Sequence, residues 1–277
     1  MTIHHFAKYE ACGNDFILFD NRHHNFPLNQ ALIQRLCHRQ IGIGADGLIL
    51  LENPTTIQAH VRFRIFNCDG HEAEMCGNGI RCLIKWMKNR GFDHDVYFIE
   101  TMHNTLKGSL THLGICVEMG TPQHIQYHIP LQFEGSSLNA SFIHIGVPHT
   151  ILFTEDIENI KIKELGHYIR HHSLWSPEGT NLTIAQKTKK NNLTVRTYER
   201  GVEGETLACG TGATAAALAA AHHYNMKAPI TVQTRLGDEL TIGFIFENQK
   251  FSEITLTGPA HPIFTGEIEL EASIRTI

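Results

Sequence analysis

The chain has 277 residues, 42% of them hydrophobic and 18% charged, so it is long enough for one large domain or two smaller ones and gives no compositional sign of disorder. The formal net charge is −5 and no long basic run occurs, which argues against a nucleic-acid partner. No charged-then-apolar leader opens the sequence, and the longest low-polarity stretch, 213–221, is too short to span a bilayer. We therefore expect a cytoplasmic protein that has no membrane partner.

Strand-like segments follow one another along most of the chain. They are rich in β-branched or aromatic residues, and they comprise 17–19, 48–51, 61–66, 96–100, 114–118, 141–145, 193–198, 230–234, 239–246 and 252–256. Helical patterns are fewer and cover 30–38, 80–89, 160–171 and 211–223. Because strands rarely alternate with helices, the pattern predicts an α+β fold rather than a doubly wound parallel sheet.

Cysteine and histidine are frequent, with seven and 20 residues. An odd cysteine count without a secretion signal does not indicate a disulfide framework, and no CxxC pair suggests a zinc ribbon. Adjacent histidines point in different directions on a strand and on a helix, so the two side chains of a doublet would not bind one metal ion together. We interpret the doublets as a compositional bias. We expect no metal site.

An internal repeat organises the chain into two halves. In each half a strand and a polar turn precede a Glu, then a Cys four residues later, then Gly-x-Gly at the start of a helix. The Glu–Cys pairs are Glu72–Cys76 and Glu205–Cys209. We expect one half to cover 1–125 and the other 126–277, with the C-terminal strands, about 262–277, as candidates for a return to the first half.

Both cysteines lie at predicted helix N-termini, where unpaired backbone N–H groups and the helix dipole favour negative charge. A thiol in that position has its pKa lowered from ~8.5 toward neutrality, which suits a group that takes and gives a proton. Two such thiols on opposite faces of one α-carbon would invert its configuration, one removing the α-proton and the other delivering a proton. Cys76 and Cys209 would exchange these roles when the reaction runs in reverse. The pattern demands no cofactor. The alternative is that both cysteines are small buried hydrophobic residues without a catalytic role. Their occurrence in two copies of the same motif argues against that alternative.

Longer motifs around these residues resemble the signatures of diaminopimelate epimerase. The matching stretches span most of the chain, and they are 8–16, 42–48, 66–82, 146–149 and 199–212. The resemblance implies two similar α+β halves, each a β-barrel-like sheet around a central helix, with the active site in the cleft between them. It also implies a homodimer, with Phe264 near the usual dimer contact unless that ring is a core residue. The implied reaction converts LL-2,6-diaminopimelate to the meso form for lysine and peptidoglycan synthesis, without a cofactor.

The resemblance carries roles to matching positions of this chain. It implies Cys76 as proton donor and Cys209 as acceptor, tuned by His149 and Glu199. Backbone N–H groups of Gly77, Asn78, Gly210 and Thr211 would hold the reacting carboxylate. The substrate's amino and carboxylate groups would be contacted by Asn14, Asn67, Asn181, Glu199 and Arg200, the last through a guanidinium that can bind a carboxylate bidentately.

Three departures from the family pattern concern the far end of the substrate. Val147 and Gly47 stand where many members have Asn and Gln, and Glu10-Ala11-Cys12 replaces a more usual triplet. Losing one hydrogen bond to a charged group costs about 1.5–3 kcal/mol, so a shorter amino acid stays open as the substrate. The alternatives are therefore a racemase of glutamate, histidine or proline on the same scaffold, or a non-catalytic binding protein that senses redox state through the two thiols.

Overall fold

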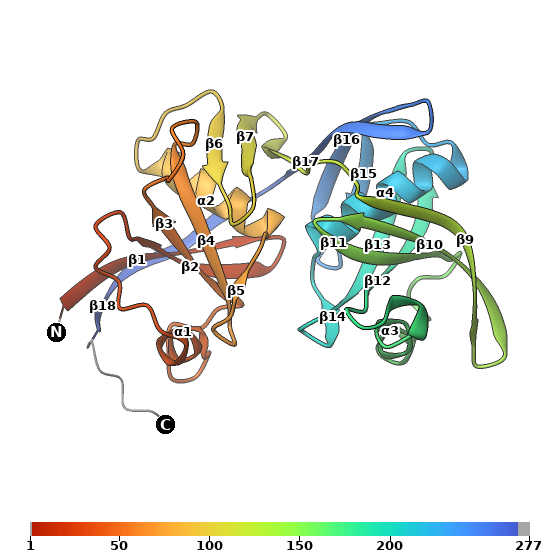
Figure 1. The fold of residues 1–277 in the computed structure, drawn as a ribbon, viewed down its shortest axis with the longest axis horizontal. Helices are drawn as coiled ribbons and strands as arrows, with labels where there is room; N and C mark the ends of the chain where they lie inside the picture. Colours follow the sequence, from red (N-terminus) through yellow and green to blue (C-terminus); the bar gives the residue numbers. More distant parts are fainter. Residues whose placement is uncertain (1, 271–277) are drawn as a thin grey trace. The chain divides into compact units, whose positions relative to one another are not determined.

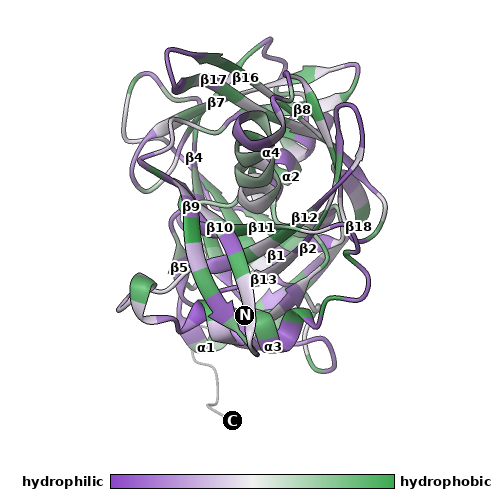
Figure 2. Cartoon of the chain, turned by 90° about the vertical axis from the view of Figure 1, so that its right-hand side faces the viewer, coloured by the Kyte–Doolittle hydropathy of each residue, from purple (hydrophilic) through white to green (hydrophobic). Residues whose placement is uncertain are grey.

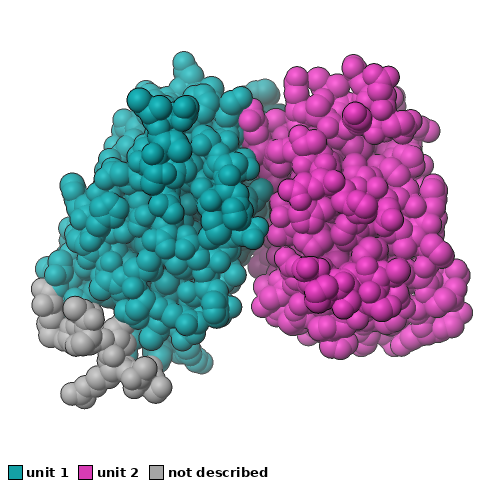
Figure 3. Space-filling view, in the orientation of Figure 1, with its two compact units in different colours: residues 1–117, 259–277 teal, residues 118–258 magenta. Residues whose placement is uncertain are grey.

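The computed structural model describes residues 2–270, which divide into two compact units (Figure 3). Unit 1 comprises residues 2–117 and 259–270, and unit 2 comprises residues 118–258. Of the C-terminal stretch expected to return to the first half, residues 271–277 lie outside the described residues. Residues 261–270 form a strand that pairs with the first strand of unit 1.

Unit 1 contains helices α1 and α2 among its strands (Figure 1). In chain order its elements are β1 (Thr2–Ala11), β2 (Asn14–Asp20), α1 (Gln30–Cys37), β3 (Gly47–Glu52), β4 (Val61–Asn67), β5 (Glu72–Ala73), α2 (Gly77–Asn89), β6 (Tyr97–Glu100), β7 (Thr105–Thr111), β8 (Gly114–Glu118) and β18 (His261–Leu270). Its strands pair in the order β18-β1-β2-β3-β4-β6-β7-β8, and the short β5 pairs with β4. The β2–β3 and β4–β6 pairs are parallel, and the others are antiparallel.

Unit 2 repeats this plan. Its elements are β9 (His124–Phe133), β10 (Ser136–Ile145), β11 (Val147–Phe153), α3 (Ile162–Arg170), the 3-10 turn η1 (Ser173–Trp175), β12 (Asn181–Lys189), β13 (Asn192–Glu199), β14 (Gly204–Thr206), α4 (Gly210–Tyr224), β15 (Ile230–Gln233), β16 (Glu239–Glu247) and β17 (Lys250–Gly258). The strand order is β9-β10-β11-β12-β13-β15-β16-β17, with β14 on β13. The parallel pairs, β11–β12 and β13–β15, fall at the same places as in unit 1.

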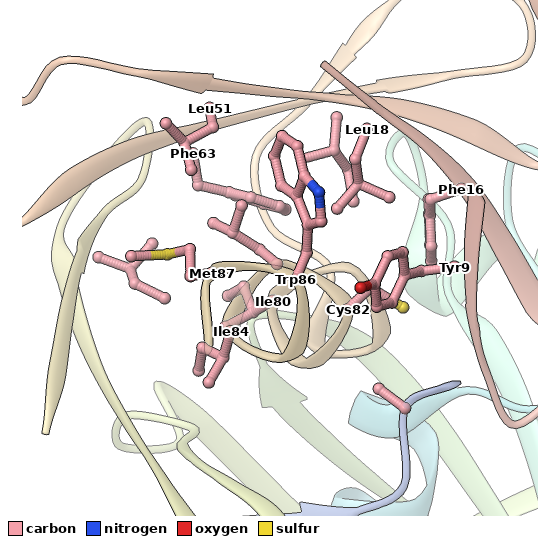
Figure 4. Packing of buried hydrophobic residues seen from close by; sticks show 14 of the residues in the cluster. Tyr9, Phe16, Leu18, Leu51, Phe63, Ile80, Cys82, Ile84, Trp86 and Met87 are labelled. Carbon is pink, nitrogen blue, oxygen red and sulfur yellow. The ribbon is translucent and has the colours of Figure 1, made fainter. Parts of the chain in front are cut away.

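Each unit wraps its sheet around one helix, α2 in unit 1 and α4 in unit 2 (Figure 1). Side chains of α2 such as Ile80, Ile84 and Trp86 pack against the inward side chains of the strands, and Figure 4 shows this cluster from close by. Helix α4 is rich in alanine, and its residues from Gly210 to Ala221 are buried. This arrangement confirms the predicted α+β class and its two similar halves.

The strands next to each central helix are buried on both faces. In β2, Phe16 and Leu18 face α2, whereas Ile17 and Phe19 face the outer cluster that includes α1. Successive side chains of a strand point to opposite faces, so a strand covered on both sides needs a continuous apolar run. This explains why these strands were visible in the sequence.

Several strands were not predicted, and their sequences show why. β9 alternates apolar and polar residues along an outer strand, a pattern that Figure 2 shows in green and purple. β9 and β18 also each contain a proline, Pro130 and Pro262, which weakens a strand prediction. β1, β7, β11 and β12 were missed as well, and β5 and β14 have only two and three residues. The four predicted helices are all present, and α2 begins three residues earlier than the predicted start at 80.

Candidate functional site

Cys76 is the N-cap of the central helix of unit 1. Its backbone is extended (φ −147°, ψ 111°), and its Sγ accepts a hydrogen bond from the Gly79 N–H at 3.4 Å. The thiol also donates to Asn14 Oδ1, 3.9 Å away. A sulfur in this position receives a backbone N–H and the positive end of the helix dipole, both of which favour the thiolate.

Two carboxamides beside Cys76 are held in one orientation. Asn14 donates from Nδ2 to Asp46 Oδ2 at 3.0 Å, which leaves its Oδ1 to accept from Cys76 and from Asn78 Nδ2 at 3.2 Å. At the other end, Arg81 Nη2 donates to Asn78 Oδ1 at 2.9 Å, which turns the Asn78 amide nitrogen toward Asn14. The acceptor that faces the Cys76 thiol is therefore fixed by a carboxylate on one side and a guanidinium on the other.

The carboxylate that orients Asn14 belongs to a charged cluster. Arg39 donates to Asp15 at 2.8 and 3.0 Å and to Asp46 at 2.7 Å, and the buried Lys8 contacts Asp15 at 2.9 Å and also bonds the Gly44 carbonyl. Burial raises the pKa of Asp15, but hydrogen bonds from Arg39 and Lys8 outweigh it and lower that pKa to about 2. Asp15 is thus ionised at physiological pH and anchors the cluster.

Cys209 is the N-cap of the central helix of unit 2, with the same extended backbone (φ −125°, ψ 111°). Its Sγ lies 3.3 Å from Thr211 Oγ1, and Thr211 Oγ1 lies 2.9 Å from His149 Nε2. On the far side of the ring, His149 Nδ1 lies 3.0 Å from Thr183 Oγ1. A hydrogen-bonded chain thus leads from the second thiol into the core of unit 2.

His149 is fully buried. Burial, reinforced by nearby His144 and Arg200, lowers the pKa of this imidazole from its ordinary 6.5 to about 3. The family resemblance implies His149 as one of the catalytic residues. In the structure its ring nitrogens contact Thr183, Thr211 and Asn181, and the Thr211 hydroxyl lies between the ring and the Cys209 sulfur.

Three further predicted site residues, Asn181, Glu199 and Arg200, also belong to unit 2. Asn181 accepts from the Arg200 N–H at 2.7 Å through Oδ1, and its Nδ2 lies 3.4 Å from His149 Nε2. Glu199 accepts a short hydrogen bond from the Thr206 hydroxyl of β14. The Arg200 guanidinium donates to the Glu178 carbonyl at 3.2 Å. In unit 1, Asn67 is exposed at the end of β4, the position that Glu199 occupies in β13.

Glycines in both signatures lie where a side chain would meet closely packed neighbours. A Cβ at Gly79 would lie 3.0 Å from Ile65 Cδ1, and one at Gly212 would lie 2.8 Å from Thr183 Oγ1. The second glycine of each Gly-x-Gly therefore lets the helix start approach its own barrel closely. Gly47 is similar, because a Cβ there would meet the Phe66 carbonyl at 2.7 Å. The missing polar side chain at 47 is thus dictated by the backbone.

Asp46 and Arg81 are the residues near the thiols that sequence reasoning did not assign. Arg81 is fully buried, and it bonds the Pro259 carbonyl at 3.2 Å and Cys12 Sγ at 3.5 Å besides Asn78. Its place in the signature around Cys76 was the only available signal. A cavity of about 290 Å³ in unit 2 lies near the C-terminal end of α4, lined by Tyr127 and His222 among others, and it contains none of the predicted site residues.

Within residues 2–270, no three His, Cys, Asp or Glu side chains gather as a metal site would require. Among the same residues, no helix is both long and apolar enough to cross a membrane.

Comparisons with known proteins place this site in a family context. The family model described as diaminopimelate epimerase matches residues 6–125 and 141–262. The diaminopimelate epimerase of Aquifex aeolicus is 36% identical over 276 residues, covering 96% of this chain and 98% of that protein. The diaminopimelate epimerase of Flavobacterium psychrophilum is 37% identical over 268 residues, covering 93% of this chain and 97% of that protein.

Solved structures share the two-halved fold at much lower identity. The Bacillus anthracis phenazine biosynthesis protein of the PhzF family has a TM-score of 0.75 at 16% identity, covering 98% of this chain and all of that chain (100%). A hydroxyproline epimerase from Agrobacterium vitis, with bound trans-4-OH-L-proline, has a TM-score of 0.71 at 15% identity, covering 96% and 92%. These likenesses bear on the fold alone, and they agree with the predicted architecture.

Proposed function

The chain belongs to the diaminopimelate epimerase family, and from that premise we propose that it converts LL-2,6-diaminopimelate to the meso form with Cys76 and Cys209 as its two acid/base groups. One observation carries the assignment of the thiols. Each is the N-cap of the central helix of its unit, at equivalent points of a duplicated fold. The product would serve lysine and peptidoglycan synthesis.

In the proposed reaction the two thiols act on opposite faces of one α-carbon. In the forward direction Cys209, as thiolate, takes the α-proton, and Cys76, as thiol, delivers a proton to the other face. Gly77 and Asn78 open helix α2, and Gly210 and Thr211 open helix α4. Their backbone N–H groups, at the positive ends of the two helices, would bind the α-carboxylate. Such donors also stabilise the negative charge that develops as the proton leaves.

The neighbours of each thiol set its protonation. Asn14 Oδ1 accepts from the Cys76 thiol, which supports Cys76 as the group that holds its proton until delivery. Thr211 links Cys209 to His149, whose neutral ring fixes the hydroxyl that faces the second sulfur. His149 is accordingly a positioning residue. Glu199, Arg200, Asn181 and Asn67 would contact the charged groups of the substrate.

Single substitutions of the two thiols test the proposal. Cys76→Ala and Cys209→Ala should each lower turnover of LL-diaminopimelate by about 10²- to 10⁴-fold, because each removes one acid/base group. Turnover is followed by ¹H exchange at Cα in D₂O. Cys116→Ala, in the half-buried strand β8, serves as the matched control and should keep wild-type turnover. Full activity in either thiol variant would refute the two-cysteine mechanism.

Substrate identity is tested in the same assay. LL-diaminopimelate, glutamate, histidine and proline are offered in parallel, since Val147 removes one polar contact at the far end of the site. We expect exchange with diaminopimelate alone. Exchange with another of these amino acids and none with diaminopimelate would favour a racemase, and thiol-dependent partner binding without any exchange would favour a redox sensor.

We also propose a homodimer that uses the surface of β18. Ile263 and Phe264 are 50% and 47% exposed. Phe264 is therefore not a core residue, which was the alternative to a place at the dimer contact. Phe264→Asp should shift the protein from dimer to monomer in sedimentation equilibrium. Leu113→Asp, at a 58% exposed residue elsewhere in unit 1, should leave the dimer intact. A wild-type monomer would contradict the proposal.

A cytoplasmic location is proposed on the same chemistry. Proton transfer needs both thiols reduced, and the reducing cytoplasm maintains them in that state. Cell fractionation with an antibody to the chain checks this location, and recovery of the protein outside the cytoplasmic fraction would contradict it.

A further inference from the structure

Each unit holds a two-pronged arginine–glutamate pair just before its cysteine. In unit 1, Arg64 of β4 donates from Nε and Nη2 to the two carboxylate oxygens of Glu72 of β5, at 2.8 and 2.7 Å. In unit 2, Arg196 of β13 donates from the same two atoms to Glu205 of β14, at 2.7 and 2.8 Å. The two pairs have matching atoms, matching distances and matching places in the strand order.

The pairs are partly buried and anchored on further groups. Side-chain exposure is 21% and 25% for Arg64 and Glu72, and 9% and 20% for Arg196 and Glu205. Arg196 also donates from Nη1 to the Ile157 carbonyl at 2.8 Å, and the hydrogen bonds from Arg196 hold the pKa of Glu205 below its ordinary value. A guanidinium fixed in this way can donate its two parallel N–H groups to a carboxylate in one geometry only.

Each pair ties together two segments that carry site residues. Three residues after each arginine the strand ends at a predicted substrate contact, Asn67 in unit 1 and Glu199 in unit 2. Four residues after each glutamate comes the cysteine that caps the central helix. The pair therefore sets the distance between the end of one strand and the segment that leads directly into the thiol.

A comparison of the two halves shows that this pair was retained while its surroundings diverged. Outside the turn, residues 64–66 and 72–79 read Arg-Ile-Phe and Glu-Ala-Glu-Met-Cys-Gly-Asn-Gly, against Arg-Thr-Tyr and Glu-Thr-Leu-Ala-Cys-Gly-Thr-Gly in residues 196–198 and 205–212. Only the Arg, the Glu, the Cys and the two Gly are identical. The Cys carries the chemistry and the second Gly is needed for packing. The pair is retained alongside them.

We propose that Arg64–Glu72 and Arg196–Glu205 are positioning residues of the epimerisation, each holding the thiol of its own unit in its N-cap geometry. The inference rests on the proposed function of Cys76 and Cys209. A displacement of a reacting group by about 1 Å can cost 10²-fold in rate, so a lead-in segment that is free to shift would lower kcat. Substrate binding through other groups would be largely kept.

Conservative variants test the bidentate arginine–glutamate contact itself. Arg64→Lys and Arg196→Lys keep the charge but lose the two-pronged contact, and Glu72→Gln and Glu205→Gln keep the shape but lose the charge. Each should lower kcat by about tenfold or more with KM within about twofold of wild type. The matched control is Asp20→Asn, because the Asp20 carboxylate accepts two hydrogen bonds from the Arg22 guanidinium, at 2.9 and 2.7 Å. Side-chain exposure in this pair is 19% for Asp20 and 33% for Arg22. It should keep wild-type kcat.

A second readout needs no substrate and so separates this inference from the proposed function. The pH dependence of alkylation by iodoacetamide is measured for each thiol, with the modified cysteine identified by peptide mass mapping. Loss of the Glu72 charge alone would lower the apparent pKa of Cys76, whereas loss of the N-cap contact raises it. We expect a rise in Glu72→Gln and in Arg64→Lys for Cys76 only, and a rise in Glu205→Gln and in Arg196→Lys for Cys209 only.

The inference is overturned if the variants keep kcat within twofold, if only KM changes, if Asp20→Asn loses as much, or if the alkylation pKa falls or stays. If the wild-type protein does not epimerise diaminopimelate but the alkylation shifts occur, the proposed function fails and the positioning role stands.

Discussion

His149 shows how strongly burial decides what a side chain can contribute. Its folded pKa of about 3 lies below the ordinary value of 6.5, so between these values the unfolded chain binds a proton that the folded chain does not. The stabilisation is therefore fully present above pH 6.5 and is lost as the pH falls toward 3. At pH 5 the loss amounts to about 2 kcal/mol of the free energy of unfolding.

We expect denaturant titrations at pH 7.5 and pH 5 to show this loss in the wild-type protein and not in His149→Gln. The exposed His23 provides a control, since His23→Gln should keep the wild-type pH dependence. If His149→Gln loses as much stability on acidification as the wild type, the imidazole is not the group responsible.

At the scale of elements, the sequence predicted what has a local signature. Cys76 and Cys209 could be placed at helix starts because Gly-x-Gly and an apolar helical pattern follow each of them. The doubly buried strands β2 and β3 were visible as continuous apolar runs. Outer strands such as β9 were not, since only one of their faces packs against the core and their alternation is interrupted by proline.

Contacts between distant segments left no comparable signal. The orientation of Asn14, for example, depends on Asp46, which lies 32 residues away in the sequence. The spacing of Glu72 and Glu205 before the cysteines was noticed, but their arginine partners on the preceding strands appear only once the strands are paired. Site residues could thus be predicted where they belong to a motif. The residues that hold them in place, such as Arg64 and Arg196, could not be predicted.

At the scale of the whole molecule, the two units differ in how their first strand is supplied. In unit 2, β9 runs into β10 through a hairpin at Glu134 and Gly135, both with positive φ (47° and 80°), and Phe133 pairs with Ser136. In unit 1, the equivalent strands are β18 and β1, which come from opposite ends of the chain, and Leu270 pairs with Thr2. Unit 1 is thus a copy of unit 2 in which this hairpin is open.

This difference predicts that unit 1 depends on the C-terminal segment for its stability. Leu270 and Ile268 pack in the cluster around α1, and Ala260 packs in the cluster around α2. A chain of residues 2–117 alone loses these contacts and leaves β1 as an unpaired edge, so we expect no cooperative unfolding transition.

Closing the open hairpin should restore folding. We consider a rearranged chain that begins with residues 259–270, continues with Asn-Gly and ends with residues 2–117. The Asn-Gly turn joins Leu270 to Thr2, and a two-residue turn of this kind matches the right-handed twist of an antiparallel strand pair. We expect this chain to unfold cooperatively in urea, as residues 118–258 alone should, because each then contains all the strands of its unit and the central helix in one continuous segment. Equal stability of residues 2–117 without β18 would show instead that the returning strand contributes little, since the core of unit 1 would then form without it.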